Sequence, residues 1–276
     1  MRDAHIHFFS DDIARNSLRY ADDANYRVIY GATPAPLCDA KRIASYLEES
    51  GTEECVALGF SWFRDDAARA ENDALLAAGT VLKNKAMLFG SVALESDFPA
   101  ADAERMKREG FHGIGEIAFY ADAVHWTYLE EIFTAAADLA MPVMLHINEP
   151  VGHAYPGKYA TDFAHLLDLI ERHPSLELIL AHLGGGLLFY EMMPEVRRIL
   201  ANCRYDTAAL PYLYEEQFLD VALAAAPGKI IFGSDYPLLK SGRYGKHISS
   251  TREQIAAATD EFFTSLRSRS SNTRKQ

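Results

Sequence analysis

The sequence has 276 residues, of which 49% are hydrophobic and 24% charged, a composition typical of a folded globular protein rather than a disordered chain. It carries 27 Lys and Arg against 39 Asp and Glu, and the resulting formal net charge of −12 disfavours nucleic acid as a partner, since phosphate backbones are bound by clustered basic side chains. A small anionic substrate held by one or two local cations stays compatible with this balance.

No apolar run reaches the roughly 20 residues that a membrane-spanning helix needs, and the first residues lack the apolar segment of a signal peptide. The cysteines, Cys38, Cys55 and Cys203, are far apart and lack the spacing of a metal site, which favours free thiols in a reducing compartment. We therefore expect a cytoplasmic protein without membrane contact. The oligomeric state stays open, a homo-oligomer included.

The first predicted strand, residues 2–8, contains a pair of histidines. Successive side chains of a strand point to opposite faces, so His5 and His7 share one face while Ile6 points away into the packing. Two neutral imidazoles side by side form half of a site for a cation such as Zn2+. Histidine pairs also occur in proteins without a metal, so the motif alone does not decide between the two.

The chain then alternates between strands and helices. Residues 9–36 predict an irregular connection with some helix, long enough to be a lid or a binding loop, and residues 39–49 predict a helix. Further strands are predicted at 54–60, 87–94, 113–119, 142–147, 176–182, 203–206 and 230–235. Further helices are predicted at 65–79, 100–109, 126–139, 162–172, 187–200 with a disturbance at Pro194, 215–225 and 252–266.

Eight strand-like segments separated by helices predict an α/β fold, a single (β/α)8 barrel. We expect residues 1–264 to form this one domain and residues 265–276 to form a flexible basic tail.

Several predicted strands end in polar side chains, and in such barrels the catalytic residues follow the carboxyl ends of the strands. They are His5 and His7, Glu116, His146, His182 and Asp235. Each has an ordinary explanation on its own: a salt-bridged acid, a hydrogen-bonded core histidine, or a turn cap. Their coincidence at one end of five strands favours a functional site, because uncompensated charge is costly to bury. For the other histidines we expect surface positions: His112, His125, His153, His165, His173 and His247.

Two late segments, Ala181-His182-Leu183-Gly184-Gly185 and Gly233-Ser234-Asp235-Tyr236-Pro237, are similar to signatures of the amidohydrolase 2 branch of the amidohydrolase superfamily, which are metal-dependent TIM-barrel enzymes. With the other strand ends, the resemblance extends from His5 to Pro237. It implies that His5 and His7 bind the more buried metal and that His146 binds or adjoins the metal. Asp235 would bind metal and accept a proton, and His182 would orient the substrate or bind a second ion.

The sequence differs from many two-metal relatives at the fourth predicted strand, where those proteins have a carbamylated lysine. Glu116 occupies that place here, and a glutamate can bridge two ions about 3.5–4 Å apart. Decarboxylases of the branch use one zinc and need no bridging acid, so Glu116 favours hydrolysis. The mixed nitrogen and oxygen donors suit one or two Zn2+ ions and would also accept Mn2+ or Fe2+.

The leading hypothesis from the sequence is a metal-dependent hydrolase of a small-molecule amide, ester or lactone bond, in which Asp235 takes a proton from a metal-activated water. The alternative is a zinc-dependent non-oxidative decarboxylase of an aromatic or unsaturated carboxylate. A phosphodiesterase is supported only by Gly115-Glu116-Ile117 and disfavoured by the acidic charge. A non-catalytic barrel that binds a ligand is a fourth hypothesis, disfavoured by the complete set of ligand types.

Substrate contacts are expected from the loops that follow the strands. The candidates are Trp62, Arg64, Tyr120, Tyr155 and Lys158. Arg64 and Lys158 are placed to hold a substrate carboxylate, or else are solvated surface charges. The aromatic side chains favour a flat or apolar ligand, or else pack within a lid.

Overall fold

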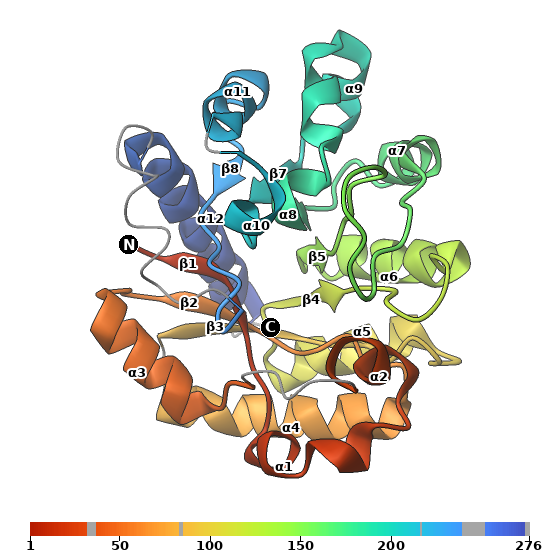
Figure 1. Cartoon of the computed structure of the whole chain (residues 1–276), viewed down its shortest axis with the longest axis vertical. Helices are drawn as coiled ribbons and strands as arrows, with labels where there is room; N and C mark the ends of the chain where they lie inside the picture. Colours follow the sequence, from red (N-terminus) through yellow and green to blue (C-terminus); the bar gives the residue numbers. More distant parts are fainter. Residues whose placement is uncertain (32–36, 83–84, 216, 239–251, 274–276) are drawn as a thin grey trace.

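The computed structural model describes residues 1–31, 37–82, 85–215, 217–238 and 252–273. Eight parallel strands form one sheet in the order of the sequence (Figure 1). They are β1 (Asp3–His7), β2 (Cys55–Leu58), β3 (Ala86–Gly90), β4 (Gly113–Ile117), β5 (Val143–Leu145), β6 (Leu178–Leu180), β7 (Cys203–Asp206) and β8 (Ile230–Ile231).

Backbone hydrogen bonds join the two ends of this sheet. The Ala4 N–H donates to the Phe232 carbonyl over 2.8 Å, and the segment after β8 continues the contact when the Asp235 N–H donates to the His5 carbonyl over 3.0 Å. The predicted (β/α)8 barrel is therefore confirmed.

Helices form the outer layer around the strands (Figure 1). They are α1 (Asp11–Arg15), the 3-10 helix η1 (Ser17–Tyr20), α2 (Ala24–Tyr30), α3 (Ala40–Ser50), α4 (Asp65–Val81), α5 (Pro99–Glu109), α6 (Trp126–Asp138), α7 (Phe163–Arg172), α8 (Ala181–Gly184), the 3-10 helix η2 (Leu187–Met192), α9 (Pro194–Ile199), α10 (Leu210–Leu213), α11 (Phe218–Ala225) and α12 (Arg252–Thr273). Within the described part of the chain, no helix combines the length and apolar character needed to cross a membrane.

Capping residues explain why several helices begin and end where the sequence predicts. The Asp39 side chain accepts the Arg42 N–H at the start of α3, and Gly51 ends that helix in the left-handed conformation at φ 66°. The predicted helix at 187–200 is divided: η2 ends before Met193, and Pro194 takes the first position of α9, where its missing N–H is not needed.

The helix α12 closes the amino-terminal end of the barrel. Its buried side chains pack against residues that line the barrel interior, namely Val56, Leu58, Phe89, Met144, Ile179 and Ile231. Ion pairs join it to the strand starts, as between Arg2 and Asp260 and between Glu177 and Arg269. The opposite, carboxyl-terminal end is left for a site.

The end of the chain differs from the predicted loose tail. The helix α12 continues to Thr273, and Leu266 is buried against the barrel interior. Residues 274–276 lie outside the described residues. The prediction failed because the Ser-rich composition after Ser265 conceals a continuing helix.

Candidate metal centre

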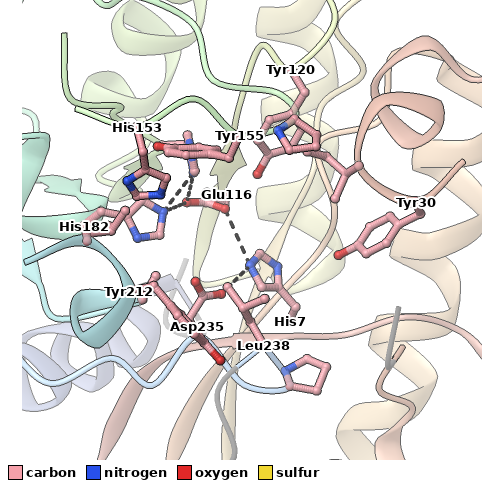
Figure 2. A pocket seen from close by; sticks show the side chains of 16 residues that line it. His7, Tyr30, Glu116, Tyr120, His153, Tyr155, His182, Tyr212, Asp235 and Leu238 are labelled. Carbon is pink, nitrogen blue, oxygen red and sulfur yellow. Dashed lines mark hydrogen bonds and ion pairs between the residues drawn. The ribbon is translucent and has the colours of Figure 1, made fainter. Parts of the chain in front are cut away.

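Side chains from five strand ends converge at the carboxyl-terminal mouth of the barrel (Figure 2). Two groups of three have all their ligand atoms within 4.8 Å of one another: His5, His7 and Glu116, and Glu116, His146 and His182. Asp235 adjoins the first group, with Oδ1 3.3 Å from His7 Nε2. The residues that the sequence predicts as ligands therefore lie together, and Glu116 belongs to both groups.

The orientation of His5 is set by a buried acid at the end of β7. His5 Nδ1 lies 2.8 Å from Asp206 Oδ2, and neither side chain has exposed surface. A carboxylate acceptor places the imidazole proton on Nδ1, which leaves the lone pair of Nε2 to face His7 and Glu116. Asp206 was not among the residues predicted for the site.

His182 is held in a similar way. Its Nδ1–H donates to the Ala208 carbonyl over 3.0 Å, and its backbone N–H donates to Asp206 Oδ1 over 2.8 Å. Both His182 and Asp235 adopt the left-handed backbone conformation, at φ 59° and 58°. Residues other than glycine adopt this conformation at a cost in free energy, and they do so most often at functional sites.

Glu116 owes its position to the residue before it. Gly115 has a φ of 139°, and a Cβ atom there would lie 2.7 Å from the carbonyl oxygen of Met144, so only glycine fits. Glu116 is 2% exposed. Its Oε1 lies 3.0 Å from His146 Nδ1, while its Oε2 lies 3.6 Å from His7 Nε2.

The electrostatics of this cluster favour positive charge. Burial lowers the pKa of His5, but the Asp206 and Glu116 carboxylates outweigh it and raise that pKa to about 9. Burial also lowers the pKa of His182, but the Glu116 carboxylate outweighs this effect and raises that pKa to about 10. Burial would raise the pKa of Asp235, yet the hydrogen bond from His7 and the charge of His5 lower it to about 2.

Despite burial, the histidines hold the pKa of Glu116 well below its usual value. The acids therefore stay ionised and require cations close to them. A divalent ion would meet this requirement in place of protons on the histidines. Imidazole nitrogens and carboxylate oxygens are also the donors that Zn2+ and Mn2+ accept, so the residues present fit such an ion.

A cavity of about 470 Å3 opens above the cluster. Figure 2 shows tyrosines around the charged floor. The lining comprises His7, Ile29, Tyr30, Glu116, Tyr120, His146, His153, Tyr155, Pro156, His182, Ala209, Tyr212, Leu213, Asp235, Pro237 and Leu238. Among these described residues there is no Lys or Arg, so the charged groups of the cavity floor are histidines and acids.

Two of the predicted substrate contacts, Tyr120 and Tyr155, line this cavity. Three others require correction. Trp62 is fully buried in an aromatic cluster, where its Nε1–H donates to Glu71. Arg64 forms ion pairs with Asp22 and Asp66 at the surface.

The third correction concerns Lys158. Its ammonium group donates to the backbone carbonyls of Val151 and His153 over 2.6 and 3.0 Å. Lys158 therefore shapes its own loop, and its side chain is not part of the cavity lining. His153 is exposed, as expected, and also lines the cavity. His247 lies outside the described residues.

The helix α2 supplies cavity residues that the sequence analysis did not name, Ile29 and Tyr30. The helix is fixed to the barrel by Asn25, whose amide donates to the carbonyls of Ser61 and Ala118 over 2.9 and 2.8 Å. The stretch expected to be a lid or binding loop thus contributes a wall of the cavity. Its residues 32–36 lie outside the described residues.

Comparison with known proteins gives one family and a set of similar folds. A family model described as amidohydrolase matches residues 3–261. None of the curated proteins matches the sequence.

Solved structures of similar fold include two decarboxylases. The 5-carboxyvanillate decarboxylase of Novosphingobium aromaticivorans, complexed with manganese and 4-hydroxy-3-methoxy-5-nitrobenzoic acid, superposes with a TM-score of 0.71 at 17% identity over 94% of this chain and 92% of its own. A 2,6-dihydroxybenzoate decarboxylase complexed with 2,6-dihydroxybenzoate gives 0.69 at 16% identity, over 96% of this chain and 97% of its own.

A probable 2-pyrone-4,6-dicarboxylic acid hydrolase from Acinetobacter baumannii, with citric acid bound, gives a TM-score of 0.57 at 16% identity, over 96% of this chain and 94% of its own. At these identities the likeness is one of fold.

Proposed function

Because this chain belongs to the amidohydrolase family, we propose that it is a metal-dependent, non-oxidative decarboxylase of a small aromatic carboxylate. The observation that carries the proposal is the cavity itself, in which a floor of histidines and acids lies beneath walls rich in tyrosine. The sequence alone favoured hydrolysis. The tyrosine-lined cavity and the two decarboxylases of similar fold support the alternative better.

In this proposal His5, His7, His146 and Asp235 hold a divalent cation, with Glu116 beside it. Manganese is present in one decarboxylase of similar fold, so both Mn2+ and Zn2+ are candidates. A bound cation would bind the substrate carboxylate and stabilise negative charge next to it. Asp206 and the Ala208 carbonyl keep the imidazoles of His5 and His182 in the required orientation.

Decarboxylation requires a proton at the ring carbon that carries the carboxylate. The bond from that carbon to the carboxylate then breaks, CO2 leaves, and the electron pair stays in the ring. We assign the proton to Nε2 of His182, because His182 lines the cavity and its Nδ1–H is already engaged by Ala208. Asp235 would take up a proton from the substrate or solvent and return it to His182.

The walls define the rest of the substrate. Tyr30, Tyr120, Tyr155 and Tyr212 contribute aromatic rings to the walls around a flat ligand. Since the described lining lacks Lys and Arg, the substrate carboxylate would be bound by the cation and the histidines. An aromatic acid with hydroxyl groups suits such a site.

Hydrolysis of a lactone is the second candidate, and one observation favours it. Glu116 belongs to both groups of possible ligands, with one oxygen toward His7 and the other toward His146. A carboxylate in that position can bridge two ions, an arrangement used to activate water for hydrolysis. One protein of similar fold is a probable lactone hydrolase.

Incubation of the Mn2+-loaded or Zn2+-loaded protein with hydroxybenzoates and with pyrone lactones separates the two functions. We expect CO2 release from a hydroxybenzoate and, in D2O, one deuterium at the vacated ring carbon. Ring opening of a lactone without CO2 release from any acid would contradict the proposal and favour hydrolysis.

A further inference from the structure

Asn148, two residues beyond His146 in the chain, contacts two residues of the cavity lining. Its side chain is 1% exposed. Its Oδ1 lies 3.1 Å from His146 Nε2 and accepts the Tyr155 hydroxyl over 2.7 Å. The other nitrogen of the same imidazole, Nδ1, lies 3.0 Å from Glu116 Oε1 and 2.9 Å from His182 Nε2.

An amide oxygen can only accept a hydrogen bond, so its contact with Nε2 requires the proton of neutral His146 on that atom. Nδ1 faces a second acceptor, Glu116 Oε1, and a cation bound between Nδ1 and Glu116 would take the place of a proton there. His5 has the opposite arrangement, because its Nδ1–H donates to Asp206 and its Nε2 faces the cluster. His146 must therefore present a different nitrogen from His5, and a separate acceptor is needed to enforce it.

We infer that Asn148 is the positioning residue for His146: it holds the proton on Nε2 and so makes Nδ1 the metal-binding atom. The inference rests on the metal centre proposed above. An acceptor that fixes the tautomer of a histidine ligand also raises its basicity, and removal of such a partner typically weakens metal binding about 10–100-fold.

If the side-chain amide of Asn148 were rotated by 180°, Nδ2 would take the place of Oδ1 and would donate to Nε2 of His146. The proton of neutral His146 would then be on Nδ1, where it would block a cation. The Nδ2 atom of Asn148 is buried without a hydrogen-bond partner. The two orientations therefore differ in a testable way, because an aspartate at this position can accept from Nε2–H but cannot donate.

Tyr155 extends the contact to the cavity wall. Its hydroxyl donates to Asn148, and its ring lines the cavity beside His153. The loop that carries it is braced by Lys158 through the carbonyls of Val151 and His153. Replacement of Tyr155 by Phe removes one bond to Asn148 and leaves its bond to His146, which makes Tyr155→Phe a matched control.

Chelator competition with Mn2+ and with Zn2+ compares the wild type with Asn148→Leu, Asn148→Asp and Tyr155→Phe. We expect about 10–100-fold weaker binding by Asn148→Leu and affinities close to wild type for the other two. Equal affinities of Asn148→Leu and wild type would overturn the inference, as would a loss in Asn148→Asp or Tyr155→Phe as large as that in Asn148→Leu. Absence of metal binding by the wild type would instead overturn the metal centre.

Imidazole 15N chemical shifts of the Zn2+-loaded wild type provide a readout that does not depend on the folding of any variant. The inference predicts a proton on Nε2 of His146 and the ion on Nδ1. A proton on Nδ1 would overturn it even if the variants behaved as expected.

Discussion

His5 Nδ1 and Asp206 Oδ2 lie 2.8 Å apart although the two residues are separated by 201 positions in the chain. The other oxygen of Asp206 accepts the backbone N–H groups of His182 and Ala208 over 2.8 and 3.1 Å. One buried carboxylate at the end of β7 therefore fixes a side chain on β1 and the backbone that follows β6.

Asp206→Asn should weaken Mn2+ or Zn2+ binding about 10–100-fold, because His5 loses the carboxylate that sets its tautomer. Titration against a chromogenic chelator measures the change. The control is Glu191→Gln, which removes a buried acid bonded to Tyr205 and Lys229, outside the cluster. Unchanged metal affinity in Asp206→Asn, or an equal loss in the control, would contradict this role.

Glu116→Gln should weaken binding of the first ion at least about tenfold and abolish binding of any second ion, because a buried negative charge next to both ligand groups is removed. Isothermal titration with Mn2+ gives both affinity and stoichiometry. Glu149→Gln changes an acid that contacts Tyr155 but belongs to neither ligand group, and should leave the stoichiometry unchanged. A Glu116→Gln protein that binds metal like the wild type would remove Glu116 from the centre.

Arg64→Ala should leave kcat/KM unchanged, since the guanidinium group is occupied by surface acids and lies outside the cavity lining.

Tyr120→Leu should raise KM about 3–10-fold, because an aromatic contact is worth about 0.5–1.5 kcal/mol. Steady-state kinetics with the substrate found by CO2 release tests both. A large rise in KM for Arg64→Ala would restore this residue as a substrate contact.

Because of Glu71, the free energy of unfolding should fall as the pH rises. Burial raises the pKa of Glu71 to about 8 in the folded protein, opposed by hydrogen bonds from Trp62 and the Phe60 N–H and assisted by the charge of Asp23. The unfolded chain ionises near the ordinary value of 4.5. Between these two pH values the folded state binds more protons, so the free energy of unfolding contributed by this group falls as pH increases.

Glu71→Gln should remove this loss. Its stability relative to wild type should improve from pH 5 to pH 8, on the order of a few kcal/mol at most. Urea unfolding followed by far-UV circular dichroism at both pH values measures the difference. A difference between the two proteins that is the same at pH 5 and pH 8 would show that Glu71 is ionised in the folded state.

Much of the site could be predicted from the sequence because its signals are local. The two-residue periodicity of β1 places His5 and His7 together, and the position of His146 after an apolar strand places it at the barrel mouth. Asp206 ends a predicted strand in the same way. Its strand is short, however, and only the contact with His5 across the barrel distinguishes it from an acid in a turn.

The loops could not be predicted in this way. Trp62 and Lys158 follow strands as Tyr120 does, but the direction of a loop side chain depends on which neighbours can satisfy it. Trp62 points into the cluster beneath α2, where Glu71 accepts its N–H, and Lys158 turns back to the carbonyls of its own loop. Tyr30 reaches the cavity because Asn25 fixes α2 across two strand ends, which no local pattern indicates.

We propose that side chains at or just after the ends of β1, β4, β5, β6 and β8 form one metal centre. Elemental analysis of protein purified without chelators tests it most directly, alongside a His5→Ala, His7→Ala double variant whose folding is checked by circular dichroism. We predict one or two equivalents of Mn2+ or Zn2+ per chain in the wild type and a loss of most of this metal in the variant. A folded wild type that retains no metal, and takes up none on titration, would contradict the claim.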